Sequence, residues 1–144
     1  MATTTTENTV NDATRPQRLH IALWIGQGLL AAVFFATGLM KVTAPIDQLK
    51  TSMSWINGPL GPYVRAIGAV ELLGVIGMIL PAATRIQPVL TPLAAIGFAI
   101  VMALGSITHG NHGELSHIGA NVVIGAIAVF VAWGRLKRAP ITPR

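Results

Sequence analysis

Glu71 is the residue of this chain whose position most strongly suggests chemistry, because it is an acid inside an apolar run, Tyr63 to Leu80. At 1.5 Å of rise per helical residue, it would lie about 10 Å below the edge of a membrane-spanning helix. An ionised group near mid-membrane costs about 2.5–3.5 kcal/mol on insertion scales, so it needs a partner, water or a proton. Two interpretations carry equal weight: a group that handles protons, and a hydrogen bond that fixes neighbouring helices. Its ionisation state stays open.

Other polar side chains gather toward one edge of the apolar runs and predict a pocket. If the chain crosses a membrane four times, they lie in the outer half of the bundle. We therefore predict an outward-facing polar pocket formed by Lys41, Glu71, Ser106, His109 and Asn121, with Glu71 at its floor. Lys41 is the natural counter-charge, but it lies about 10 Å shallower, so that water or Asn121 would bridge the pair. Alternatively, Lys41 extends to the lipid headgroups.

Three histidines and an acid lie close together in the sequence and raise the question of a metal or haem: His109, His112, Glu114 and His117. Their spacing differs from zinc-binding patterns in which two histidines share one face of a helix. A solvated loop is the favoured interpretation. No metal is predicted and haem is disfavoured, whereas a bound quinone stays an open alternative. The chain has no cysteine, which excludes thiolate metal sites and iron–sulfur clusters within it.

Four apolar runs must position these side chains, and they cover residues 20–40, 63–80, 89–108 and 118–133. A membrane-spanning helix needs about 20 apolar residues, so the first and third runs fit well and the fourth is short. Hydrophobic residues make up 52% of the chain and charged residues only 10%, against about a quarter charged in soluble domains. The sequence predicts an all-α membrane protein, a bundle of four transmembrane helices.

The segments outside these runs are more polar. Residues 1–18 lack apolar periodicity and predict a disordered N-terminal tail, and residues 136–144 form a basic C-terminal tail, which leaves a membrane domain over residues 19–135. Between the first two runs, Ile46, Leu49, Met53 and Ile56 recur at helical spacing and predict a short amphipathic helix in the membrane interface. The first run is longer than the apolar core of a cleaved signal peptide, so an uncleaved span is favoured over cleavage.

Small residues at helical spacing mark one face of each run. Around Glu71 that face carries Gly68 and Gly74, and in the fourth run it carries Asn121 and Gly125. Such stripes let membrane helices approach closely, so the polar residues on them should point into the bundle.

Basic residues predict the orientation. Seven of the ten Lys and Arg residues lie at the termini or between the second and third runs: Arg15, Arg18, Arg85, Arg135, Lys137, Arg138 and Arg144. Lys41, Lys50 and Arg65 lie on the other side. Because loops rich in Lys and Arg stay in the cytoplasm, we predict a multi-pass protein of the cell membrane with both termini cytoplasmic. No basic stripe is interleaved with exposed aromatics, which argues against nucleic-acid binding.

Five short segments occur in a fixed order: Phe35 to Lys41, Ile67 to Gly74, Leu80 to Ala82, Thr91 to Ala95 and Val131 to Arg135. Over about residues 19–135, they resemble the DoxX-like family of small four-helix membrane proteins. The resemblance implies recurring polar positions at Gly38, Lys41 and Glu71, without assigning them a catalytic role. The family is named for membrane subunits of a thiosulfate:quinone oxidoreductase, and some relatives are linked to membrane-associated oxidative-stress complexes.

The function that follows is an accessory subunit of a membrane-associated redox or quinone-linked system, an inference from family association. One alternative is a small membrane enzyme or quinone-binding protein that uses Glu71 and Lys41 for proton handling. Another is a transporter of a small solute or proton, although only Gln27 is polar in the inner half. A structural assembly factor is a fourth alternative. The expected partners are the lipid bilayer and a membrane redox protein, with homo-oligomers an open option. Whether the chain is an enzyme stays undecided.

Overall fold

The protein is built of helices. The computed structural model describes the backbone of residues 3–144 and the side chains of residues 16–144, and no strand occurs in that part of the chain. Its long helices are α1 (Thr3–Thr43), α3 (Val64–Thr84), α4 (Leu90–Asn111) and α5 (Leu115–Trp133). The short elements are α2 (Ile46–Ser52), the 3-10 turns η1 (Ser54–Asn57) and η2 (Gly61–Tyr63), and the π-helical turn η3 (Gly134–Arg138). The predicted all-α bundle, with a short helix between the first two spans, is confirmed.

Four helical stretches are long and apolar enough to cross a membrane: Pro16–Thr43, Gly61–Thr84, Leu90–Asn111 and Leu115–Arg138. Many of their large apolar side chains point outward; Val70 and Leu73, for example, are 62% and 65% exposed. In a bilayer such side chains face the acyl chains, while helical hydrogen bonding satisfies the backbone. The chain is therefore a multi-pass membrane protein.

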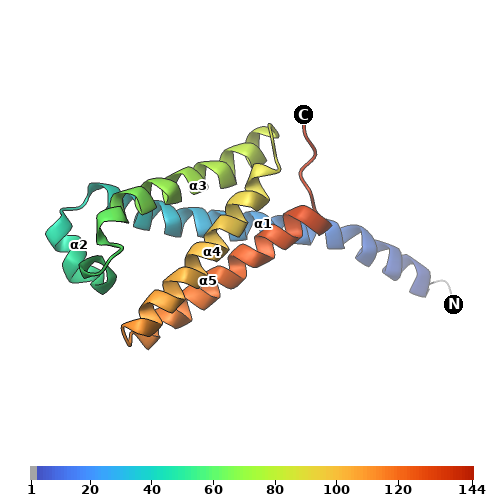
Figure 1. The fold of residues 1–144 in the computed structure, drawn as a ribbon. Coiled ribbons are helices and arrows are strands. Elements are labelled where there is room, and N and C mark those ends of the chain that lie inside the picture. Colours follow the sequence, from blue (N-terminus) through green and yellow to red (C-terminus); the bar gives the residue numbers. More distant parts are fainter. Residues whose placement is uncertain (1–2) are drawn as a thin grey trace.

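The four spans form two antiparallel pairs, α1 with α3 and α4 with α5, which diverge toward α2 (Figure 1). We call the end that carries residues 44–63 and 110–116 the α2 end. The opposite end carries residues 16–20, the turn at 85–89 and the C-terminal residues, and we call it the terminal end. There the backbone N–H of Arg144 donates to the carbonyl of Arg85 at 3.2 Å, which ties the chain's last residue to the turn between α3 and α4.

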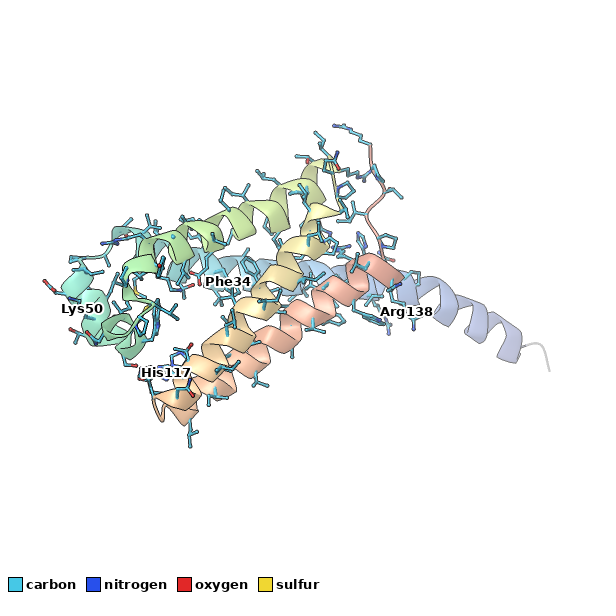
Figure 2. All side chains as sticks on the ribbon, viewed as in Figure 1. Phe34, Lys50, His117 and Arg138 are labelled. Atoms are coloured by element: carbon cyan, nitrogen blue, oxygen red, sulfur yellow. The ribbon has the colours of Figure 1, made fainter. Side chains whose placement is uncertain are left out.

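Aromatic and aliphatic side chains join the two pairs in the middle of the bundle. Phe34 of α1 stacks on Phe98 of α4, with ring centroids 3.7 Å apart and 5° between the planes. Met78 of α3 and Val131 of α5 are both fully buried in the same cluster. Gly74 makes room for this contact, since a Cβ there would lie 2.6 Å from the Phe98 ring. Figure 2 shows Phe34 between His117 at the α2 end and Arg138 at the terminal end.

A second apolar cluster holds the connection between the first two spans. Leu49 of α2, Ile56 of η1 and Val64 of α3 are buried together. The predicted amphipathic helix is divided here: α2 ends at Ser52 because Met53 is extended, with φ −134° and ψ 97°, and Ile56 belongs to η1. The buried apolar residues of this segment, Leu49 and Ile56, therefore pack onto the ends of α1 and α3, whereas Ile46 faces the surface.

The ends of the spans differ from the sequence expectation. A disordered tail is predicted over residues 1–18, whereas α1 is helical from Thr3 onward. An α-helix satisfies its own backbone hydrogen bonds, so it can continue beyond the apolar segment. At the other terminus, helical backbone continues through η3 to Arg138, three residues into the predicted C-terminal tail.

Candidate functional site

Lys41 and Glu71 form a buried ion pair between α1 and α3. The Lys41 ammonium lies 2.7 Å from each carboxylate oxygen of Glu71. Glu71 is 2% exposed and Lys41 is 9% exposed. The pair is direct, so the sequence-based expectation of a gap bridged by water or Asn121 is wrong. Lys41 points into the bundle and does not extend to the headgroup region.

The directions of the two side chains explain why they meet. Side chains of an α-helix lean toward its N-terminus. Lys41 therefore leans from the end of α1 toward the middle of the bundle, and Glu71 leans from the middle of α3 toward the α2 end. Each shortens the separation that helical rise alone predicts.

Two glycines bring the helices together beside the pair. A Cβ at Gly68 would lie 2.7 Å from the Lys41 Cβ and 2.8 Å from the carbonyl oxygen of Gly38. A Cβ at Gly38 would lie 3.0 Å from the carbonyl oxygen of Gly68. The backbones of α1 and α3 thus touch at these two positions, as small residues permit in membrane helix pairs.

Two more polar side chains support the pair. The Thr37 hydroxyl lies 3.5 Å from the nearer oxygen of Glu71, within reach of a weak hydrogen bond. Arg65 donates to the carbonyls of Lys41 and Ala44 at 2.7 Å each. These hydrogen bonds satisfy two backbone carbonyls at the C-terminal end of α1 and just after it. The Glu71 carboxylate therefore binds the Lys41 ammonium, and Arg65 of α3 binds the backbone of Lys41.

The other three residues of the predicted pocket belong to the other helix pair. Ser106 donates to the carbonyl of Met102 on its own helix at 2.9 Å. Asn121 packs against α4, where a Cβ at Gly105 would lie 2.9 Å from its side-chain nitrogen, and this nitrogen has no hydrogen-bond partner. Within the described part of the chain, no hydrogen bond joins these residues to Lys41 or Glu71. The five predicted residues therefore form two groups.

His109 belongs to a cluster at the turn between α4 and α5. Its Nδ1 lies 2.5 Å from one carboxylate oxygen of Glu114, and the Ser54 hydroxyl donates to the other at 2.6 Å. The rings of His109 and His117 have centroids 4.9 Å apart. Glu114 lies outside the spans. Hydrogen bonds from Ser54 and His109 lower its pKa, so that it is a carboxylate at neutral pH. The sequence predicts a solvated loop here, but the structure joins three of its four polar residues.

Arg135 anchors a polar cluster at the terminal end that the sequence analysis missed. It is 3% exposed, and its Nε donates to the side-chain oxygen of Gln27 at 2.7 Å. Gln27 and Thr91 are fully buried, and both donate to the carbonyl of Met78, at 3.3 and 3.1 Å. The Arg135 guanidinium also lies 5.5 Å from the centroid of the Trp24 ring.

The sequence does contain a signal for this cluster. Gln27 stands alone in the inner half of the first apolar run, and a buried amide needs hydrogen-bond partners. Arg135 follows the fourth apolar run, a position that predicts a basic residue at the membrane surface. Because η3 continues the helix past Gly134, which packs against Leu23, Arg135 instead turns into the bundle.

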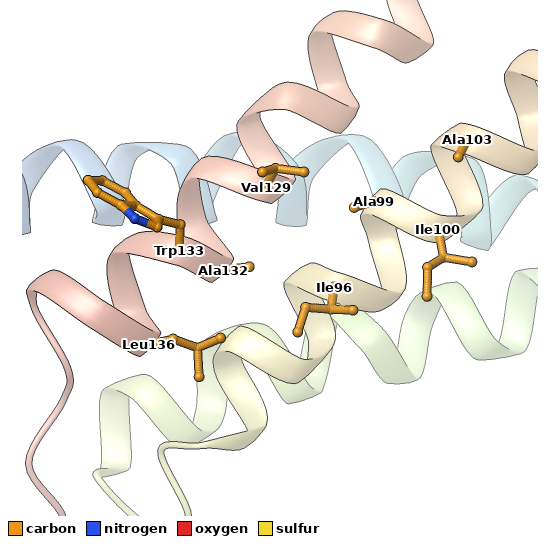
Figure 3. Close-up of a pocket in the computed structure, with 8 residues that line it drawn as sticks. All are labelled: Ile96, Ala99, Ile100, Ala103, Val129, Ala132, Trp133 and Leu136. Atoms are coloured by element: carbon orange, nitrogen blue, oxygen red, sulfur yellow. The ribbon is translucent and has the colours of Figure 1, made fainter.

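An apolar groove of about 380 Å³ lies on the outer face of α4 and α5 (Figure 3). Ile96, Ile100 and Ala103 of α4 face Val129 and Trp133 of α5 across it. The residues that line the groove are aliphatic except for Trp133, as on a surface that acyl chains cover, so the groove adds no charged group to a binding site.

The sequence model of the DoxX-like family matches residues 25–131, a range that contains Lys41 and Glu71 and ends before Arg135. Neither the comparison with curated proteins nor the comparison with solved structures gave a match. The family match covers most of the chain, including all of α2, α3 and α4. It also contains Lys41 and Glu71, two of the positions that the resemblance implies. The chain belongs to the DoxX-like family.

Proposed function

We propose that this protein is a non-catalytic accessory subunit of a membrane-associated redox or quinone-linked system. The observation that carries the proposal is the state of Glu71, the one acid within the apolar part of the described spans. Both of its oxygens are bound by Lys41, and 2% of its surface is exposed. A catalytic acid or base must reach the proton that it transfers. Glu71 instead holds α1 against α3.

The redox association rests on the family and on composition. The family's name derives from subunits of a quinone-linked oxidoreductase, and this supports a partner of that kind. Because the chain has no cysteine, it lacks a thiol relay of its own, and electron transfer would occur in the partner. The apolar outer faces of the helices provide the surface on which a membrane partner would pack.

Transport is less well supported. The polar clusters at the two ends are separated by the stacked rings of Phe34 and Phe98 and by buried Met78. A polar solute would have to cross this apolar layer, where it would lose its hydrogen bonds to water. Absence of flux of small solutes and protons into liposomes that contain the purified chain is the expected result.

The proposal includes the cytoplasmic membrane as location, with both termini in the cytoplasm. Its support is the charge distribution, since the terminal end carries Arg85, Arg135, Lys137, Arg138 and Arg144. The chain has no native cysteine, so a single introduced cysteine reports on one position. An impermeant thiol reagent applied to whole cells should label His112→Cys and spare Pro140→Cys. The reverse pattern would contradict the orientation.

The accessory role is tested by a strain that lacks the chain and is complemented with variants. Wild type, purified in mild detergent, should bring down a membrane redox protein whose abundance falls in the deletion strain. Mass spectrometry identifies the protein, and solvent extraction reports any quinone. The double variant Lys41→Met/Glu71→Leu keeps the apolar volume and removes both charges.

If the pair is structural, this double variant should restore the partner's abundance to near the wild-type level. Leu73→Met, on the exposed face of α3, is the matched control and should behave as wild type. A different outcome would overturn the proposal: the chain purifies alone, turns over a quinone or another substrate, and loses that activity in a folded double variant.

A further inference from the structure

The cluster at the turn between α4 and α5 has the composition of a metal site. His109 is in the last turn of α4, Glu114 precedes α5, and His117 is in the first turn of α5. One ligand-type atom from each of the three residues lies within 4.8 Å of the corresponding atoms of the other two. Two imidazoles and one carboxylate are the protein ligands of many zinc sites that keep a fourth position open.

We propose that His109, Glu114 and His117 bind a divalent transition-metal ion of the Zn²⁺ class at the α2 end. Zn²⁺ sits about 2.0–2.2 Å from such ligands, which places ligand atoms of a tetrahedral site about 3.3–3.6 Å apart. Ligand atoms as far apart as 4.8 Å must therefore approach by about 1.2–1.5 Å, whereas His109 Nδ1 and the Glu114 oxygen, 2.5 Å apart, must separate by about 1 Å. Both movements are within reach of small side-chain rotations. At the His109 nitrogen and Glu114 oxygen, now 2.5 Å apart, the ion would replace the hydrogen between them.

The turn that carries the ligands is fixed by backbone contacts. The N–H of Glu114 donates to the carbonyl of His109 at 2.9 Å. Gly113 has φ 73°, a conformation that glycine adopts without steric cost, and it reverses the chain between the two helices. The relative positions of His109 and Glu114 are thus set by the turn, and His117 follows one helical turn later.

Ser54 supplies the orienting contact that metal sites need. Its hydroxyl donates to one oxygen of Glu114 at 2.6 Å, while the other oxygen faces His109. Hydrogen bonds of this kind orient a carboxylate ligand and are characteristic of metal sites. Since Ser54 belongs to η1, a metal at this site would also connect the segment between α1 and α3 to the α4–α5 turn.

The histidine spacing explains why the sequence alone does not reveal this site. The ligands come from two helices and the turn between them, whereas the zinc pattern His-Glu-x-x-His lies on one helix. His112 belongs to the same loop but is exposed, and its Nδ1 contacts the carbonyl of Thr108 at 2.8 Å. It is therefore a matched control: a histidine of the same loop outside the cluster.

The test is a titration of the purified full-length chain in detergent with ZnCl₂, followed by calorimetry and by thermal unfolding. Wild type should bind at a single site, and zinc should raise its Tm, because a ligand of the folded state stabilises that state. His109→Ala, Glu114→Gln and His117→Ala should each lower the affinity by more than 100-fold. Ser54→Ala should lower it about tenfold, the usual effect of an orienting partner. His112→Ala should bind as wild type does.

His117 is exposed, so His117→Ala tests the site even if another variant fails to fold. Equal affinities of wild type and His117→Ala would overturn the proposal. So would an equal loss in His112→Ala, because it would show that the loop binds zinc through any histidine. A rise in the Tm of folded His117→Ala with zinc, equal to that of wild type, would also contradict it.

Discussion

Among the described side chains, two cations are buried, Lys41 and Arg135, and they are stabilised in different ways. Lys41 reaches toward the middle of the bundle and binds a carboxylate at 2.7 Å. Arg135 has no carboxylate within reach among the described side chains; its contacts are Gln27, Trp24, His20 and the carbonyl of Ala139. Arg135 lies at the C-terminal end of α5 and η3, where the helix dipole and unpaired carbonyls favour a positive charge. Helix dipoles and carbonyl groups can thus stabilise a buried cation at a helix terminus. A cation in the middle of the bundle needs an opposite charge.

The largest effect on stability should come from removing the acid of the ion pair and leaving its lysine in place. Glu71→Leu leaves the Lys41 ammonium buried without its partner, which should lower the free energy of unfolding by about 3–5 kcal/mol. Thermal unfolding in detergent, followed by circular dichroism, measures the loss. Val70→Leu, at the neighbouring exposed position, is the control and should be neutral. Equal Tm values for Glu71→Leu and Val70→Leu would show that the ion pair adds nothing.

A second substitution tests the close approach that lets the pair form. Gly68→Ala places a methyl group 2.7 Å from the Lys41 Cβ and 2.8 Å from the Gly38 carbonyl oxygen. Overpacking of this kind should cost about 1–3 kcal/mol. Gly28→Ala, where nothing lies within 4 Å of the new Cβ, should be neutral or slightly stabilising. If both variants unfold at the wild-type temperature, then α1 and α3 are not in backbone contact at Gly68.

At the terminal end, Arg135→Met should cost less than Glu71→Leu. It removes the buried charge itself and leaves neutral acceptors without a donor, of which the side-chain oxygen of Gln27 is fully buried, a loss of about 1–3 kcal/mol. The double variant Arg135→Met/Gln27→Leu should recover part of the loss. The same unfolding assay applies to both. A larger loss for Arg135→Met than for Glu71→Leu would reverse the comparison between the two clusters.

The smallest effect concerns pH and the α4–α5 turn. Hydrogen bonds from Ser54 and His109 lower the pKa of Glu114 from 4.5. A carboxylate with a depressed pKa in the folded state contributes stability above its unfolded pKa, and this contribution is lost as pH falls through the folded value. Wild type should therefore lose more Tm between neutral pH and pH values below 4.5 than Glu114→Gln does. Parallel Tm profiles for the two proteins would show that the carboxylate has no such role.

The sequence allowed the number of spans, the short helix between the first two and the two main polar positions to be predicted. Long apolar runs leave few alternatives in a bilayer, and an acid such as Glu71 stands out within one. The direct contact with Lys41 could not be predicted from helical rise, because it depends on side-chain direction and on the Gly38–Gly68 approach. The Arg135 cluster depends on η3 continuing the helix, which no local pattern indicates. The His109 cluster depends on which residues a turn between two helices brings together.

The most direct test of the account is a double-mutant cycle on the ion pair with the charges exchanged. Lys41→Glu and Glu71→Lys are made singly and together, and thermal unfolding and recovery of the redox partner are measured for each. Each single variant buries two like charges and should be strongly destabilised, while the double variant should regain most of the Tm and of the partner. If the exchanged pair is as unstable as the two single variants combined, or folds but no longer supports the partner, the acid has a specific role that mutual neutralisation does not explain.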